Sequence, residues 1–80
     1  MAGTITIVTT VDARGLACPL PLTMAKLRMA DLAPGETLVV LATDPEAPID
    51  LGAWAAVAGH VLSERPLDGW IEFRLVKAGG

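Results

Sequence analysis

The stretch that decides the fold lies near the start of the chain, where residues 4–32 read TITIVTTVDARGLACPLPLTMAKLRMADL. Its first part, Thr4–Val11, mixes isoleucine and valine with threonine in partial alternation, which is typical of a β-strand. Pro19 suits the first position of a helix, because the N–H that proline lacks would be unpaired there. We therefore predict a strand over Thr4–Val11 followed directly by a helix over Pro19–Leu32, which stops before Pro34-Gly35.

The rest of the chain predicts a second strand, a second helix and a closing hairpin. A run of β-branched residues and leucine follows Pro34-Gly35, and an alanine-rich segment follows Asp44, which we expect to cap the second helix. Asp68-Gly69 favours a tight turn between the last two strands. The predicted elements are a strand at Glu36–Ala42, a helix at Ala47–Gly59, and strands at His60–Arg65 and Trp70–Lys77.

The predicted order βαβαββ defines the fold class. Crossovers between parallel strands are right-handed, so both helices should pack on one face of a four-stranded mixed sheet. The product is an α+β two-layer sandwich, within the broader α/β class, formed by a single domain over residues 1–80. Hydrophobic residues make up 52% of the sequence, which is enough to fill one such core. We expect the first helix to face the sheet with Leu22, Ala25, Met29 and Leu32, which recur at helical spacing.

Composition and charge argue against several classes of protein. The six lysine and arginine residues are scattered and the formal net charge is -3, which disfavours direct binding of nucleic acid. The longest nearly uncharged stretches are shorter than the roughly 20 residues that span a bilayer, so we expect no membrane segment. The start MAGTITIVTT lacks the features of a signal peptide, which favours a cytoplasmic location. Cys18 is the only cysteine and His60 the only histidine, so we expect neither a disulfide nor a metal site.

Cys18 is the candidate reactive residue, because it lies immediately before the predicted start of the first helix. Unpaired N–H groups and the helix dipole favour negative charge there, so we predict a thiol pKa below the free-cysteine value of about 8.5. Pro19 and Pro21 stiffen the first turn, and Gly15 permits a positive φ in the preceding loop. A lowered pKa would suit a residue that accepts sulfur. The alternative is that Cys18 is a small apolar residue without chemistry.

The segment Val11–Pro21, VDARGLACPLP, resembles the Cys-Pro-X-Pro signature of the TusA-like (SirA/TusA) sulfur-carrier family. The resemblance continues through Pro34-Gly35-Glu36, Thr43-Asp44-Pro45, the spacing of Asp50 and Trp54, and Gly59-His60, and so covers nearly the whole chain. It implies a βαβαββ sandwich in which Cys18 is the catalytic residue. The residues that would support the motif are Asp12, Gly15, Pro19 and Pro21.

The same resemblance implies a function. Cys18 would take persulfide sulfur from a protein donor such as a cysteine desulfurase or a rhodanese and hand it to another sulfur-relay protein. Such a sulfurtransferase acts as a carrier and needs no cofactor beyond the covalent persulfide on Cys18. The end uses in such systems include tRNA 2-thiouridine, the molybdenum cofactor and sulfur oxidation. Leu20 stands where many members carry glutamate, a difference that bears on which partner is served.

Two other functions are compatible with parts of the sequence. A regulatory or protein-binding module could keep this fold without moving sulfur. Ubiquitin-like sulfur carriers end in Gly-Gly, as this sequence does at Gly79-Gly80, and hold sulfur as a C-terminal thiocarboxylate. Those carriers have a β-grasp order that begins with a hairpin, whereas here a helix follows the first strand directly. The thiocarboxylate reading is therefore the weaker of the two.

The predicted partner-binding residues are Leu20, Met24 and Leu27. If the core stripe of the first helix faces the sheet, these three residues lie on the opposite side of the helix and should be exposed. Leu20 adjoins Cys18 within two positions, so an apolar strip would begin at the sulfur site. Exposed apolar patches commonly mark contacts between proteins.

Five further residues have a possible role. His60 could serve as a base for Cys18 only if the fold brought it across the molecule, so we expect an ordinary packed or surface histidine. Asp12 and Arg14 lie on the approach to Cys18 and could tune its charge, although such residues are usually turn formers. Trp54 and Trp70 fall in apolar patterns, and we expect both to pack in the core.

Overall fold

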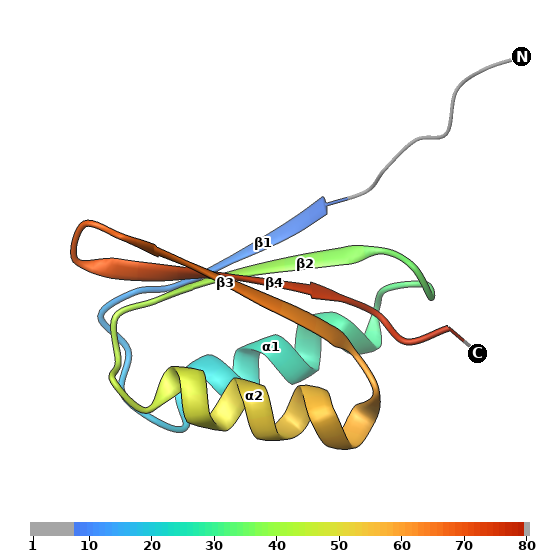
Figure 1. Ribbon diagram of the computed structural model, residues 1–80, viewed down its shortest axis with the longest axis horizontal. Coiled ribbons are helices and arrows are strands. Elements are labelled where there is room, and N and C mark those ends of the chain that lie inside the picture. The colour runs from blue at the N-terminus through green and yellow to red at the C-terminus, as the bar shows by residue number, and fades with distance from the viewer. Residues whose placement is uncertain (1–7, 80) are drawn as a thin grey trace, which may run out of the picture.

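The computed structural model describes residues 8–79 and confirms the predicted order βαβαββ (Figure 1). The elements are β1 (Val8–Ala13), α1 (Leu20–Ala30), β2 (Thr37–Ala42), α2 (Ala47–Ala58), β3 (Val61–Leu67) and β4 (Trp70–Val76). The Thr4–Ile7 part of the first predicted strand lies outside the described residues.

The four strands form one mixed sheet in the order β1-β2-β4-β3. β1 and β2 are parallel, and α1 connects them, whereas β4 is antiparallel to both β2 and β3. Both helices cover the same face of the sheet and leave the other face open, as Figure 1 shows. The predicted two-layer α+β sandwich is therefore confirmed.

Several element ends differ from the prediction because tertiary partners decide them. β1 continues past Val11 to Ala13, where its last residues pair with the end of β2. β3 runs through Pro66 to Leu67, which leaves a short turn at Asp68-Gly69. Proline is tolerated in β3 because this strand lies at the edge of the sheet.

The first helix is also shorter than predicted, starting at Leu20 and ending at Ala30. Pro19 is the N-cap, since its carbonyl accepts the N–H of Thr23 at 3.0 Å. At the other end, the Lys77 ammonium donates hydrogen bonds to the carbonyls of Met29 and Leu32, so a side chain from beyond β4 satisfies the end of the helix.

The core lies between the helices and the covered face of the sheet. Its largest fully buried side chains are Phe73, Leu38, Leu51, Leu75 and Val40. Of the predicted α1 stripe, Ala25 and Met29 are buried, while Leu22 and Leu32 are only half-buried against the core. Pro21, which was predicted only to stiffen the helix start, is buried as well. The buried line of α1 therefore runs Pro21, Ala25, Met29, at a spacing of one helical turn.

Both tryptophans were predicted to pack in the core, but both are only half-buried. Trp54 packs at the border of the core and meets the His60 ring edge-on, with 5.1 Å between ring centroids. Trp70 lies on the open face of the sheet, because the alternate residues of β4 face the helices, and the Arg14 guanidinium sits 4.9 Å from the centre of its ring.

No helix within residues 8–79 is long and apolar enough to cross a membrane.

Candidate functional site

Cys18 lies in the loop between β1 and α1, where its side chain is exposed and its thiol is free. It directly precedes the N-cap Pro19, and the peptide bond between these two residues is cis. The prediction that the cysteine is presented at the start of the first helix is therefore confirmed. Cys18 therefore lies one residue outside the helix, and the effect of the helix dipole falls off beyond the first turn.

The loop after β2 holds the Cys18 loop in place. The Gly15 N–H donates to Thr43 Oγ1 at 2.9 Å, and the Cys18 N–H donates to Asp44 Oδ2. These contacts form because β1 and β2 are parallel neighbours, so the loops that follow them leave the same edge of the sheet. Gly15 has a φ of 80°, a positive value of the kind that glycine permits, and its N–H points toward Thr43.

Asp44 was predicted to cap α2, but it does not. Its side chain accepts the Cys18 N–H with one oxygen and the Glu46 N–H at 3.0 Å with the other. The N-cap of α2 is Glu46, which makes no side-chain capping bond. The Asp44 carboxylate thus ties the Cys18 backbone to the start of α2.

A second carboxylate reaches the sulfur itself. Asp50 lies in the first turn of α2, and its Oδ2 accepts a hydrogen bond from Cys18 Sγ at 2.9 Å. No local pattern predicts this contact, because the two residues are 32 positions apart. The spacing of Asp50 and Trp54 was noted only as part of the family resemblance, without a role for the carboxylate.

The nearby carboxylates raise the pKa of the Cys18 thiol. The hydrogen bond to Asp50 raises the pKa of the Cys18 thiol to about 11, with smaller contributions from desolvation and from the negative charges of Asp50, Asp44 and Glu46. The predicted lowering of this pKa is therefore wrong. A thiol beside negative charges keeps its proton, since a thiolate there would be repelled. The carboxylates around Cys18 therefore favour the protonated thiol.

Asp12 and Arg14 pair with each other at the start of the loop. Arg14 donates from Nε to Asp12 Oδ1 at 2.9 Å and from its terminal nitrogen to Oδ2 at 2.8 Å. The hydrogen bonds from Arg14 hold the pKa of Asp12 at about 2. Because Arg14 also stacks on Trp70, the pair anchors the loop to the open face of the sheet. Neither side chain hydrogen-bonds to Cys18, so both shape the loop from a distance.

His60 follows the C-terminal end of α2 and contacts Trp54 and Ala78 rather than Cys18. Its Nδ1 accepts the Ala78 N–H at 2.9 Å, and burial lowers the pKa of its imidazole, with a smaller contribution from Lys77. This histidine is packed at the end of α2 and makes no bond with Cys18, as the sequence led us to expect.

The predicted partner-binding strip is only partly exposed. Leu20 is 47% exposed and Leu27 is 67% exposed. Met24 is half-buried and packs against the core, so its predicted exposure is wrong. The reason is that the buried line of α1 includes Pro21, which lies one turn before Met24 and draws this side of the helix toward the sheet.

A groove between the helices extends the site along their outer surface. It is lined by Leu22, Lys26, Asp50, Ala53, Trp54 and Val57. Asp50 belongs both to this groove and to the hydrogen bond with Cys18, so the groove adjoins the sulfur. Leu22, which was predicted to face the sheet, packs against the core and also forms part of the groove wall.

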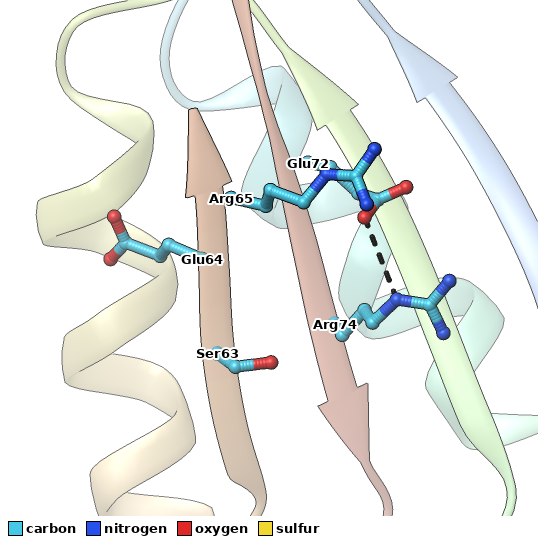
Figure 2. A pocket seen from close by; sticks show the side chains of 5 residues that line it. All are labelled: Ser63, Glu64, Arg65, Glu72 and Arg74. Carbon is cyan, nitrogen blue, oxygen red and sulfur yellow. Dashed lines mark ion pairs between the residues drawn. The ribbon is translucent and has the colours of Figure 1, made fainter. Parts of the chain in front are cut away.

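A second hollow lies over β3 and β4 and contains none of the predicted site residues. Figure 2 shows its lining, which is Ser63, Glu64, Arg65, Glu72 and Arg74. Arg74 Nε lies 3.5 Å from Glu72 Oε1, so one of the two arginines is already paired. Among the described residues 8–79, no three histidine, cysteine or acidic side chains are placed to hold a metal ion.

Comparison with known proteins defines the family. The model of the family described as "Sulfurtransferase TusA" matches residues 9–77, and the chain belongs to this family. YrkF of Bacillus subtilis is 43% identical over 70 residues, which cover 88% of this chain but only 38% of YrkF. YrkI of the same organism is 43% identical over 67 residues, which cover 78% of this chain and 89% of YrkI. Both relatives carry the name "putative sulfur carrier protein".

A solved structure supports the same fold. The crystal structure of the SirA-like protein from Desulfitobacterium hafniense matches with a TM-score of 0.80 at 30% sequence identity. The match covers 92% of this chain and 100% of the other. The resemblance to the SirA/TusA family that the sequence suggested is therefore confirmed.

Proposed function

We propose that this protein is a sulfur carrier that holds sulfane sulfur as a persulfide on Cys18 and relays it between partner proteins. The observation that carries the proposal is the single free thiol, exposed in a loop that two hydrogen bonds tie to the β2–α2 loop. The names of the relatives and the membership of the TusA family support the carrier role.

The chemistry is an exchange of one sulfur atom between two thiols. The Cys18 thiol and a donor persulfide become a Cys18 persulfide and a donor thiol, so no external oxidant or reductant is consumed. The exchange needs no cofactor, because the transferred sulfur is carried covalently. It does need the thiol to remain reduced, which fits a cytoplasmic location.

The partners on both sides are proteins. A cysteine desulfurase or a rhodanese would supply the sulfur, and a further relay protein would receive it for tRNA thiolation, molybdenum cofactor formation or sulfur oxidation. Leu20 and Leu27 would contribute to docking, because both are exposed on the helix that follows Cys18. A small apolar anchor of this kind suits a brief complex in which the two sulfurs must meet.

Loading with labelled sulfur tests the proposal directly. The protein is incubated with a cysteine desulfurase and cysteine, then treated with a persulfide-selective alkylating reagent and digested for mass spectrometry. The label is expected on the peptide that contains Cys18. A protein that gains no sulfur under these conditions would instead fit a regulatory module, and sulfur on the C-terminal Gly79-Gly80 would fit a thiocarboxylate carrier.

A further inference from the structure

The hydrogen bond between Cys18 and Asp50 has a consequence for sulfur transfer. Asp50 Oδ2 lies 2.9 Å from Sγ, and it is the only side-chain group within residues 8–79 that is hydrogen-bonded to the sulfur. Asp50 is half-buried on α2, an element held by core contacts of Leu51 and Ala55, so its position does not depend on a loose loop. A carboxylate is an acceptor when ionised and a donor when protonated.

The geometry points to Asp50 as the group that takes the Cys18 proton when sulfur is loaded and returns it when sulfur is passed on. This role rests on the proposed function, since it concerns the same transfer at the same sulfur. A thiol is a poor nucleophile until its proton leaves, and proton transfer to a positioned side chain contributes substantially to such steps.

The loading step balances with Asp50 as the base. Cys18 Sγ attacks the terminal sulfur of a donor persulfide, and a new S–S bond forms as the S–S bond of the donor breaks. The electron pair of the broken bond leaves with the donor cysteine sulfur as a thiolate. The Cys18 proton moves to Asp50 Oδ2 during the attack and stays there, and the donor thiolate takes a proton from water. The products are a Cys18 persulfide and a donor thiol.

The unloading step uses the same carboxyl group as an acid. The acceptor thiolate attacks the terminal sulfur of the Cys18 persulfide, and Sγ departs with the electron pair of the broken bond. A sulfur whose thiol has a high pKa is a poor leaving group as a bare thiolate. A proton from Asp50 converts it into a neutral thiol as the bond breaks, and the resting hydrogen bond is restored.

The negative charge of Asp50 also disfavours the Cys18 thiolate. A competing explanation of the contact is therefore that Asp50 only keeps the thiol protonated. Asp44 and Glu46 from the β2–α2 loop act in the same direction, while Lys26 of α1 lies across the groove from Asp50. If Asp50 only suppressed the thiolate, its neutralisation would speed up loading at neutral pH. If Asp50 accepts the proton, its neutralisation slows loading even though the thiolate becomes easier to form.

The pH dependence of loading in Asp50→Asn separates the two explanations. Sulfur uptake from cysteine persulfide, a small donor that needs no protein docking, is followed by rapid quenching and mass spectrometry between pH 6 and 10. Glu46→Gln is the matched control, because it removes a nearby negative charge that does not contact the sulfur. The donor titrates identically in every sample, so ratios of wild-type to variant rates report on Cys18 alone.

We expect Asp50→Asn to load about 10-fold or more slowly than wild type at pH 7. The difference should narrow toward pH 10, where the thiolate forms without help, and Glu46→Gln should load at least as fast as wild type throughout. Asp50→Asn loading as fast as wild type or faster at pH 7 overturns the role of Asp50 and leaves the proposed function intact. Wild-type protein that takes up no sulfur at any pH overturns both.

Discussion

Disulfide exchange at Cys18 should be slow at neutral pH and should accelerate steeply as the pH rises. With a thiol pKa of about 11, roughly one Cys18 in 10,000 is a thiolate at pH 7. A free cysteine with a pKa of about 8.5 is roughly 3% thiolate at the same pH, which is about 300-fold more. The thiolate of a high-pKa thiol is intrinsically more nucleophilic, by about 10-fold over this difference at a Brønsted slope near 0.45.

Through the thiolate alone, without proton transfer to Asp50, Cys18 is expected to react roughly 25-fold more slowly than a free cysteine at pH 7. The two reaction rates should become equal at about pH 10, because free cysteine is then fully ionised while the fraction of Cys18 present as thiolate is still increasing. The assay is the reaction with 4,4′-dithiodipyridine, an uncharged disulfide that the carboxylates neither attract nor repel. A peptide with a single cysteine is the reference.

A plateau of the Cys18 rate at or below about pH 8.5 would refute the reasoning. It would mean that the helix start outweighs the three carboxylates, as the sequence alone had suggested. The measurement involves no sulfur transfer, so it tests the electrostatics of the site independently of the proposed function.

Four further outcomes follow from the same structure. Cys18→Ser should abolish sulfur loading while the circular dichroism spectrum and melting curve stay close to wild type, since the side chain is exposed; persulfide label retained in this variant would exclude Cys18 as the carrier. Leu27→Glu should slow transfer to and from protein partners but leave loading from cysteine persulfide unchanged, and Ala30→Glu, also exposed on α1, serves as its control; equal transfer by the two variants would remove Leu27 from the docking surface. Leu51→Ala should lower the free energy of unfolding in urea by about 2–5 kcal/mol, because a fully buried side chain leaves a cavity; a loss below about 1 kcal/mol would mean that the core closes around the gap. Lys77→Met should cost about 1–3 kcal/mol in the same assay, because two carbonyls at the end of α1 lose a charged donor, and unchanged stability would show that water replaces the ammonium without loss.

Most of the fold was accessible from local patterns. The strand at the start of the chain, the proline before the first helix, and the Asp68-Gly69 turn each act over a few residues, so the order of elements could be predicted. The exposure of Leu20 and Leu27 also followed from helical spacing. The same spacing failed for Met24, since a helix can rotate by part of a turn to bury Pro21 without changing its periodicity.

The ends of elements depended on partners far along the chain. β1 reaches Ala13 because β2 offers ladder partners up to Ala42. At the end of α1, Lys77 donates to the carbonyl of Met29 in the last turn and to that of Leu32 just beyond it. Neither partner is visible in a local window of sequence. Boundary predictions therefore differed from the structure by a few residues while the types of the elements were right.

The sequence by itself determined that a lone cysteine is presented in a loop at the start of a helix, because Pro19 and Gly15 impose their backbone geometry locally. Only the tertiary structure decided the chemistry of that cysteine. The parallel pairing of β1 with β2 brings Asp44 and Asp50 to Cys18 from 26 and 32 positions away. Electrostatic energy depends on distance in space, so carboxylates remote in sequence reverse the direction in which the helix start alone would shift the thiol pKa.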